Sequence, residues 1–495
     1  MAFNSYAFLF LVLPLALALF LLAPPRLRRV FLVTASLFLY YWSEGPYAAI
    51  LPVVVLALYL AARANGWGRR GGRAGFALAL ALTLLLLVYF KYGGFLAASF
   101  NSLRAFLALP PLRFKQVHLP LGISFFLFSA ISCLVDCRRA GAGAGRPRLA
   151  SIALYVTFFP KLLTGPLVPF RRFAEMEAGF GVTAPRLRAG IRRFVMGLGK
   201  KALVADALAR AANGVFSLPA GELDLGLAWI GLAAFALQIY FDFSGYSDMA
   251  IGLGAIFGFD LPENFRHPYW ARSVREFWTR WHITLSQWFR DYIFLPLAYR
   301  LLGRLPQERY LGVRAESWSY AGATTLTMLL CGFWHGAGWG FALWGLYHAA
   351  FMLLEHFGWE KRLKRAPRPW GHLYAMLAVA GGWVLFRSPS PAYAGAFFRA
   401  LLGLGRGSGA LYFPALFVDR EVLAAAAVAL AGSVPLLPWL GERIRRLLAP
   451  WRPGRPRLTA SALAAARLAF LALVAALSTL AIAGGSYQPF LYLRF

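Results

Sequence analysis

The sequence CGFWHGAGWG, Cys331 to Gly340, places a single histidine, His335, among tryptophan rings and glycines. It interrupts an apolar stretch from Tyr320 to Leu354, which is longer than the about 20 residues that one membrane span needs. Glycine lets other backbone come close, and an ionisable side chain at membrane depth is costly enough that a function is its default explanation. We therefore expect a broken helix or a tight hairpin inside a membrane, with His335 at the break.

The composition also indicates a membrane protein. Of the 495 residues, 60% are hydrophobic and only 14% are charged, unlike an ordinary soluble domain. The first apolar run follows no basic segment and is followed by further apolar runs, which favours a retained span over a cleaved signal peptide. We predict one all-α, multi-pass membrane domain over residues 1–495. The long apolar runs are Tyr6 to Leu22, Tyr47 to Ala62, Ala74 to Phe90, Leu225 to Tyr240, Leu373 to Phe386, Val422 to Leu440 and Leu458 to Ala483.

Basic residues are concentrated in the short loops between these runs. Lysine and arginine outnumber aspartate and glutamate by 51 to 20, which on a soluble protein would indicate a nucleic-acid partner. In loops of a membrane protein the same excess marks the cytoplasmic side, so we expect membrane lipid and no nucleic acid as a partner. Arg63 to Arg73 and Lys361 to Arg368 are then cytoplasmic, and both chain ends lie outside. The basic, amphipathic segment from Ala184 to Ala211 is expected to lie on the cytoplasmic leaflet.

The segment LYVTFFPKLLTGPLVPF, Leu154 to Phe170, carries Lys161 and two prolines in its middle. It runs between two basic stretches that both favour the cytoplasm. Irregular backbone at membrane depth is tolerated where protein or water covers it, so we predict a re-entrant segment here.

A second histidine lies in EFWTRWHITLSQWFRDYIFLPL, Glu276 to Leu297. If this segment is one helix, His282 shares an aromatic face with Trp278 and Trp288. Such a residue can be a packed histidine bonded to a carbonyl, or it can be functional, and the presence of His335 favours the second interpretation. His348 lies in an ordinary apolar helix and is expected to be structural.

Two carboxylates, Asp242 and Asp248, lie in the apolar segment QIYFDFSGYSDMAIG. Buried carboxylates need donors, so they could orient a histidine, bind a coupling ion or hold helices together in a polar network. The sequence leaves these alternatives open.

Histidine suits acyl transfer to an alcohol. Its unperturbed pKa near 6.5 allows it to take a proton from a hydroxyl at neutral pH. This reaction needs no metal, and the sequence contains no HExxH motif. Cys133, Cys137 and Cys331 form no zinc-type pair. We expect no metal and no tightly bound cofactor.

The segment PENFRHPYWARSVREFWTRWHITLSQWFRDYIFLPL, followed by GFWHGAGWGFALWGLYHA, resembles the membrane-bound O-acyltransferase family. The resemblance is to its bacterial branch, which acylates exported polysaccharides. It extends from about Leu119 to the end of the chain. Further matching segments are Leu119 to Ser132, Phe158 to Leu167 and Gln238 to Leu253.

The resemblance implies a bundle of about ten or more membrane helices, with re-entrant segments, around a central channel. It implies that His335 is catalytic and that His282 is the second active-site histidine. One departure from related proteins is at Leu127 and Ser129, where tyrosine and glutamine are more frequent, and it concerns the shape of the donor tunnel. The residues expected to line the channel or to support the histidines are Asp242, Asp248, Asn264, Ser286, Arg290 and Trp334.

The expected reaction moves an acyl group, acetyl first, from a cytoplasmic thioester to hydroxyls of an extracytoplasmic polysaccharide, directly or through a secreted partner acetyltransferase. Acetyl-CoA is the expected donor, with an acyl carrier protein as the alternative, and the expected location is a bacterial inner membrane. The first rival function is D-alanyl transfer to teichoic acid. The second is a proton-coupled transporter, which would usually show matching broken helices in two halves of the chain.

The C-terminal segment, residues 488–495, contains PFLYLRF. It resembles a C-terminal motif of this branch in which the tyrosine is proposed to carry the acyl group, so Tyr492 is a candidate carrier. Alternatively, Phe490, Tyr492 and Phe495 anchor the tail at the outer membrane interface.

Overall fold

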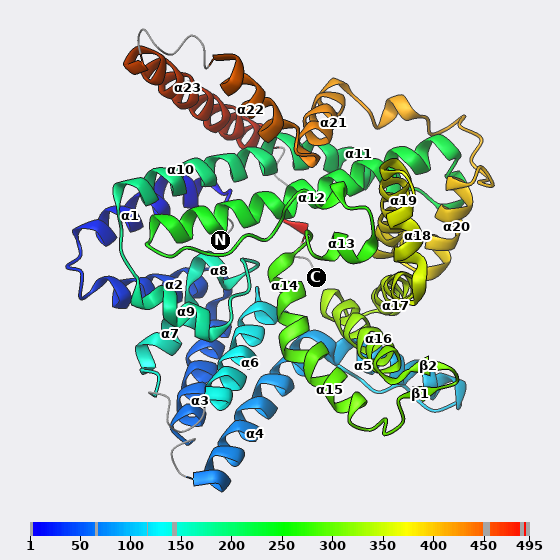
Figure 1. Ribbon diagram of the computed structural model, residues 1–495, viewed down its shortest axis with the longest axis horizontal. Helices are drawn as coiled ribbons and strands as arrows, with labels where there is room; N and C mark the ends of the chain where they lie inside the picture. Colours follow the sequence, from blue (N-terminus) through cyan, green and yellow to red (C-terminus); the bar gives the residue numbers. More distant parts are fainter. Residues whose placement is uncertain are drawn as a thin grey trace.

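The computed structural model describes residues 3–64, 68–115, 117–140, 146–448, 456–485 and 490–491. These residues form mainly helices (Figure 1). The strands among them are β1 (Arg309–Tyr310) and β2 (Val313–Arg314), which pair in one short antiparallel hairpin. The predicted all-α class is therefore confirmed for the described part of the chain.

The N-terminal helices are α1 (Leu13–Leu22), α2 (Arg28–Glu44), α3 (Ile50–Ala64), α4 (Gly68–Leu87), α5 (Gly93–Phe106), α6 (Ile123–Ala140), α7 (Leu149–Thr157), α8 (Phe159–Leu162) and α9 (Phe170–Ala178). The central helices are α10 (Ala184–Gly199), α11 (Asp206–Phe216), α12 (Leu225–Ile256), α13 (Val274–Trp278), α14 (Ile283–Phe289), α15 (Leu295–Leu302), α16 (Ala315–His335) and α17 (Trp339–Leu354). The C-terminal helices are α18 (Glu360–Arg365), α19 (Arg368–Arg387), α20 (Pro391–Leu401), α21 (Arg420–Ser433), α22 (Leu436–Leu448) and α23 (Pro456–Ala483). Short π-helical segments occupy Ala7–Val12, Val88–Tyr92, Lys200–Ala205, Arg290–Phe294 and Glu355–Trp359, and 3₁₀ turns occupy Gly45–Ala49, Ala220–Glu222, Pro268–Trp270 and Pro414–Leu416.

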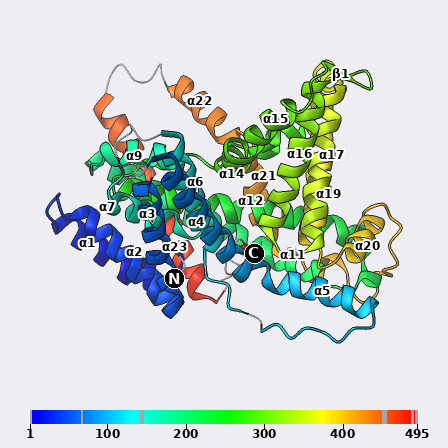
Figure 2. The ribbon, with the colours of Figure 1, turned by 90° about the horizontal axis from the view of Figure 1, so that it is seen from below.

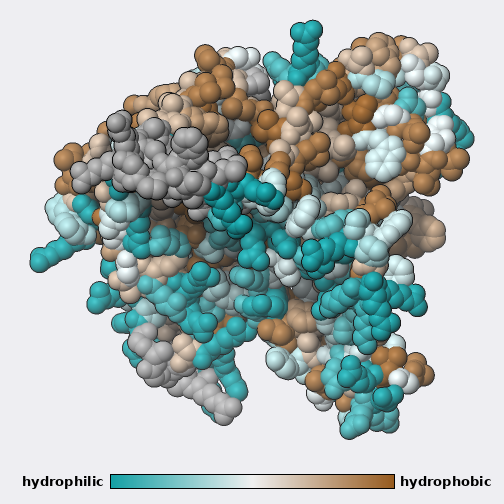
Figure 3. Space-filling view, turned by 45° about the horizontal axis from the view of Figure 1, so that its top comes forward, coloured by the Kyte–Doolittle hydropathy of each residue, from teal (hydrophilic) through white to brown (hydrophobic). Residues whose placement is uncertain are grey.

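The outer helices expose large hydrophobic side chains. Leu22 in α1 is 81% exposed, and Leu85 in α4 and Leu468 in α23 are also exposed. Exposed apolar surface on helices that are long and apolar enough to cross a membrane indicates contact with lipid. In Figure 3, hydrophobic side chains gather along the upper margin and hydrophilic ones over the middle of the face. The protein is an integral membrane protein.

Among the described residues, 4 helical segments are long and apolar enough to cross a membrane. They are Arg28–Ala64, Arg70–Phe106, Leu225–Ile256 and Ala464–Ala483. The larger number of spans stays a prediction. One expected run, Val422 to Leu440, is not a single helix: α21 ends at Ser433 and α22 begins at Leu436, because Pro435 has no backbone N–H with which to continue α21.

Helix α12 joins the two apolar cores of the protein. Phe235 and Phe241, in its first part, are buried in the core shared with α11 and α19. Met249 and Leu253, toward its end, are buried in the core shared with α2, α6 and α7. Residues on α12 are therefore held rigidly between the two halves of the molecule.

Helix α10, the first part of the segment predicted to lie on the cytoplasmic leaflet, packs against α12. Figure 1 shows α10 running alongside α12. The helices approach closely because glycines face each other: a Cβ on Gly197 would lie 2.6 Å from the carbonyl oxygen of Gly245, and one on Gly190 would lie 2.7 Å from that of Gly252. One face of α10 is thus buried against α12, and the position of this segment on the cytoplasmic leaflet stays a prediction.

The expected hairpin around His335 is confirmed. Helices α16 and α17 lie side by side in Figure 2 and are separated only by residues 336–338. A Cβ on Gly332 would collide with the carbonyl of Phe341, and a Cβ on Gly345 would collide with that of Met328. These glycines permit the contact between the two helices and so position His335 at the end of α16.

The chain between Leu154 and Phe170 is broken, as predicted. Helix α7 ends at Thr157, and the short α8 carries Lys161, which is buried. The Lys161 ammonium donates to the Ser129 hydroxyl at 3.2 Å and lies 4.3 Å from the centre of the Tyr155 ring. A polar interior is therefore present at this break, whereas a re-entrant path through the membrane stays a prediction.

Candidate active site

His282 lies at a break between helices and not within one. The segment Glu276 to Leu297 was expected to form a single helix, but α13 ends at Trp278 and α14 begins at Ile283. His282 precedes α14 with a left-handed backbone, φ +43°. It is fully buried, with its ring 4.5 Å from the Phe243 ring. The aromatic surroundings were predicted correctly, but the helical geometry was wrong.

The side chain of Asn264 stabilises this break. Its Oδ1 accepts from the backbone N–H of Thr284 at 3.3 Å and from the Thr284 hydroxyl at 3.0 Å, and its Nδ2 donates to the Ser247 hydroxyl at 3.0 Å. The backbone carbonyl of Asn264 also accepts from the N–H of Ile283 at 2.9 Å. The first turn of α14 is thus held by a residue 20 positions earlier in the chain.

The same network determines the tautomer of His282. Its Nδ1 lies 3.0 Å from Asn264 Oδ1. A backbone N–H can only donate, so the Asn264 atom that faces Thr284 must be the amide oxygen. Nδ1 of His282 therefore carries a proton, and in the neutral ring Nε2 holds the lone pair. His282 can accept a proton or a hydrogen bond at Nε2.

His335 ends α16 and is 2% exposed. Its ring is surrounded by aromatic rings, with centres at 4.7 Å for Trp334, 4.9 Å for Trp344 and 5.2 Å for Phe386. Trp334 also lies 6.0 Å from the His282 ring, so one tryptophan contacts both histidines. The structure thus brings His282 together with Trp334 and His335, which lie far from it in the sequence.

His348, expected to be structural, belongs to the same aromatic cluster. Its ring centre lies 4.9 Å from Trp344 and 5.2 Å from Trp278. It belongs to α17, packs against Trp278 of α13 and is buried.

A large cavity of about 980 Å³ lies near this site, although neither His282 nor His335 is among the residues that line it. Ser286 and Arg290 of the predicted set line it, together with Met328 and Cys331 from α16. Cys331 is one helical turn before His335. The charged residues in its lining are Arg272, Arg275, Arg290, Lys364 and Arg368, against Glu276 and Glu360.

Basic residues neutralise one of these acids. Lys364 and Arg275 lie 2.8 Å and 2.6 Å from Glu360, and these contacts, led by the hydrogen bond from Lys364, hold the pKa of that carboxyl below its usual range. With five basic and two acidic side chains in its lining, the cavity favours an anionic ligand.

His335 also faces a second, much smaller cavity of about 30 Å³. Lys91, Ser124 and Trp334 share its lining. Sequence reasoning missed Lys91. A signal existed, because it is a lone lysine within an apolar run, and a cation at membrane depth is expected to have a function.

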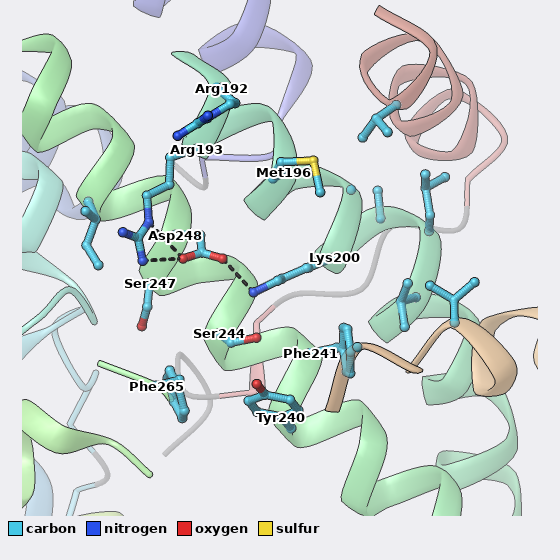
Figure 4. Close-up of a pocket in the computed structure, with 18 of the residues that line it drawn as sticks. Arg192, Arg193, Met196, Lys200, Tyr240, Phe241, Ser244, Ser247, Asp248 and Phe265 are labelled. Atoms are coloured by element: carbon cyan, nitrogen blue, oxygen red, sulfur yellow. Dashed lines mark hydrogen bonds and ion pairs between the residues drawn. The ribbon is translucent and has the colours of Figure 1, made fainter. Parts of the chain in front are cut away.

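Asp242 and Asp248 form ion pairs between helices, as expected if they hold helices together in a polar network. Figure 4 shows Arg193 and Lys200 converging on Asp248, at 2.8 Å and 2.6 Å. Asp242 lies 2.7 Å from the ammonium of Lys201. These pairs connect α10 and the following π-helical segment to α12. Because both carboxylates bind basic side chains that lie on a neighbouring element, the geometry favours the structural network.

A third cavity, of about 1,480 Å³, lies beside Asp248 and reaches Ser247 and Asn264 (Figure 4). This cavity therefore lies next to Asn264, whose side chain binds His282. Among the described residues, no group of three or more histidine, cysteine or acidic side chains is arranged to bind a metal ion.

The described part of the C-terminal tail is buried and does not lie at an interface. Phe490 is 1% exposed and packs on the Tyr246 ring at 4.8 Å, and the Lys201 ammonium lies 4.7 Å from its ring centre. The backbone N–H of Leu491 donates to Asp242 at 2.9 Å. Phe490 is therefore not an interfacial anchor. Tyr492 lies outside the described residues.

Comparison with known proteins identifies the family. The sequence profile of the membrane-bound O-acyltransferase family matches residues 37–389. The chain is 37% identical to a probable alginate O-acetylase of Azotobacter vinelandii, over 82% of this chain and 79% of that protein. It is 31% identical to a peptidoglycan O-acetyltransferase of Helicobacter pylori, over 81% of this chain and 80% of that protein. It is 30% identical to a teichoic acid D-alanyltransferase of Bacillus subtilis, over 56% of this chain and 71% of that protein. The chain belongs to the membrane-bound O-acyltransferase family.

Proposed function

We propose that this protein transfers acetyl groups from a cytoplasmic thioester toward hydroxyls of an extracytoplasmic polysaccharide, in the inner membrane of a bacterium. One observation carries the proposal: the buried His335 lines a small cavity at the end of α16, and Cys331, one helical turn earlier, lines a large basic cavity. Trp334 contacts both His335 and a second histidine, His282, whose Nε2 holds a lone pair. An O-acyltransferase needs this combination of an anion-binding entrance and a buried base.

The basic cavity suits a nucleotide-linked thioester. Phosphates would bind at the arginines of its lining, and the pantetheine arm would extend past Leu285 and Met328 toward Cys331. Two of the basic residues, Lys364 and Arg368, belong to the loop that the positive-inside rule assigns to the cytoplasm. Acetyl-CoA is the donor we propose. The phosphopantetheine of an acyl carrier protein would offer only one phosphate to the same lining.

The chemistry follows from the two histidines. His335 would remove the proton from the acceptor hydroxyl as its oxygen attacks the thioester carbon. His282 would position or polarise a reacting group through Nε2. The C–S bond then breaks, and the thiolate takes up the proton, so atoms and charge balance without a metal.

The acceptor is proposed from the relatives. The proteins named for alginate and for peptidoglycan both transfer acetyl by their names and match this chain over about four-fifths of its length, 82% and 81%. The D-alanyltransferase matches over 56%, so acetyl transfer is favoured over D-alanyl transfer.

The acyl group would reach the acceptor through Tyr492, either directly or by way of a secreted partner transferase. A hydroxyl that carries the acyl group divides one transfer into two easier ones. The proposal is supported by the preceding residue, because Leu491 is buried and bonded to Asp242 in the protein interior.

A donor assay tests the function. Purified protein is given labelled acetyl-CoA or labelled acetyl carrier protein, and transfer to a polysaccharide and release of the free thiol are followed. We expect turnover with acetyl-CoA, weakened by the charge reversal Arg368→Glu through a higher KM. The exposed Arg406, distant in sequence from this cavity and absent from its lining, provides the matched control Arg406→Glu. Turnover with the carrier protein alone would contradict the donor assignment.

A further inference from the structure

Lys91 lies next to the end of α16, on the side of the small cavity. It belongs to the π-helical segment Val88–Tyr92 between α4 and α5, and π-helical turns inside α-helices are frequent at functional sites. Its ammonium donates to the backbone carbonyl of Trp334 and, at 3.3 Å, to the Ser124 hydroxyl. The carbonyl of Trp334 is one peptide away from His335.

The ammonium has one donor more than these contacts use. A lysine ammonium carries three N–H groups. Within the described part of the chain, the Lys91 ammonium donates to these two acceptors and lies 5.7 Å from the centre of the Trp334 ring. The side chain is half-buried and lines the cavity that His335 also lines. The third N–H can therefore be directed to a group inside this cavity.

The cavity has room for a carbonyl oxygen. Its volume of about 30 Å³ exceeds the roughly 10–15 Å³ that one water-sized group requires. Apart from Lys91, Ser124 and His335, its lining is backbone and apolar side chains such as Leu121, Phe125 and Leu163. Most of the residues in this lining are buried, and apolar surroundings lower the local dielectric constant, so a fixed cation acts more strongly on developing charge here than in water.

We propose that Lys91 is a catalytic residue that binds the carbonyl oxygen of the transferred acyl group and stabilises its oxyanion. This inference rests on the proposed function. The acceptor oxygen forms a bond to the carbonyl carbon, its proton passes to His335, and the carbonyl electron pair moves onto the oxygen. The third N–H of Lys91 donates to that oxyanion. When the C=O bond reforms, the C–S bond breaks and the thiolate leaves with the proton.

The structural alternative is that Lys91 only caps α16. A cation near a helix C-terminus satisfies free carbonyls and is favoured by the helix dipole. Tyr92 makes the same kind of contact, because its hydroxyl donates to the carbonyl of Phe333 at 2.9 Å. The two roles can be separated, since Tyr92 does not line the small cavity.

The experiment compares Lys91→Met, Lys91→Arg and Tyr92→Phe, with the exposed Lys115→Met as a further control. For each purified protein, acetyl-CoA affinity, kcat and melting temperature are measured. Loss of one oxyanion donor typically lowers kcat by about 10²–10³-fold. We expect that loss in Lys91→Met with unchanged acetyl-CoA affinity, a smaller loss in Lys91→Arg, and wild-type kcat in Tyr92→Phe. If Lys91→Met does not fold, Lys91→Gln, which keeps a donor without the charge, replaces it.

Two results would overturn the proposal. Wild-type kcat in a folded variant without the cation would show that no charge is needed at this position. A fall in kcat in Tyr92→Phe as large as that in Lys91→Met would assign the effect to capping of α16. Failure of the proposed function is distinguishable, because the wild-type protein itself would then turn over neither acetyl-CoA nor an acyl carrier protein, and the role of Lys91 would fall with it.

Discussion

At the scale of single residues, Asn264 organises the site. One amide oxygen meets the His282 ring, the Thr284 N–H and the Thr284 hydroxyl, and the Thr284 hydroxyl in turn accepts from the N–H of Leu167 at 3.0 Å. The backbone N–H of Leu167 donates to the Thr284 hydroxyl, and the backbone N–H of Thr284 donates to Asn264 Oδ1. Because these two donors cannot be reversed, Nδ1 of His282 must also donate to Asn264 Oδ1, and its protonation follows from the fold. The residue that determines the tautomer is therefore as informative about mechanism as the histidine.

Substitution of Asn264 should reduce activity through the His282 tautomer. In Asn264→Leu the acceptor for Nδ1–H is lost, and we expect kcat to fall by about 10–100-fold, by analogy with the loss of groups that orient metal-bound histidines. In Asn264→Asp an acceptor remains, so the loss should be smaller. Steady-state kinetics of the purified variants, with melting temperatures alongside, would test this. Equal kcat in the two variants would show that the tautomer does not matter.

The proposed carrier can be tested at one atom. Tyr492→Phe keeps the ring and removes only the hydroxyl, so an aromatic contact should tolerate it whereas a carrier cannot. We expect loss of polymer acylation, measured as ester content at equal protein level. Without polymer, the wild-type protein should release one thiol per protein from acetyl-CoA as Tyr492 is acylated, and the Tyr492→Phe protein should release none. Tyr41→Phe, at an exposed tyrosine of α2, is the control. Unchanged acylation in Tyr492→Phe would end the carrier proposal.

At the scale of helices, the α16–α17 hairpin was predictable and the α13–α14 break was not. The glycines at positions 332, 336, 338 and 340 predict a close turn from the sequence alone. The segment Glu276 to Leu297 has helical periodicity and no glycine or proline near His282. Its break depends on Asn264, which comes from the loop after α12, and such a tertiary contact leaves no local signal. The same holds for Lys201, whose two partners, Asp206 and Asp242, become visible only when the helices are packed.

The hairpin predicts a steep dependence on glycine size. In Gly332→Val the added side chain meets the carbonyl of Phe341, and overpacking of this kind typically costs about 1–3 kcal/mol. We expect a lower melting temperature in detergent and loss of activity, because His335 ends the displaced helix. Gly340→Ala is the matched control, since its nearest atom, the Leu385 carbonyl oxygen, is 3.9 Å from the added Cβ. A stable and active Gly332→Val protein would contradict the packing.

At the scale of the whole molecule, the account requires that the basic cavity opens to the cytoplasm. The sequence predicted this side from its basic loops and predicted the family from its histidine motifs. The number of spans, the path of the Leu154 to Phe170 segment and the sidedness need a membrane to be tested.

Sidedness can be measured with one introduced cysteine. Lys361→Cys, in a background with Cys137→Ser, places a thiol in the predicted cytoplasmic loop, and the other two native cysteines, Cys133 and Cys331, are buried. We expect a membrane-impermeant maleimide to label it in inverted vesicles and not in intact cells. Labelling from intact cells alone would place the donor cavity on the wrong side of the membrane.

The central claim is that His335 is the base for acyl transfer, and His335→Ala tests it most directly. The measurement is the rate of acetyl transfer from labelled acetyl-CoA by purified protein, with His348→Ala as the matched control because both histidines are buried beside Trp344. We predict that His335→Ala binds acetyl-CoA and keeps its fold but loses transfer by at least about 10²-fold, the lower end of what general-base catalysis contributes. His348→Ala should retain most of the rate. Wild-type transfer by a folded His335→Ala protein would contradict the account.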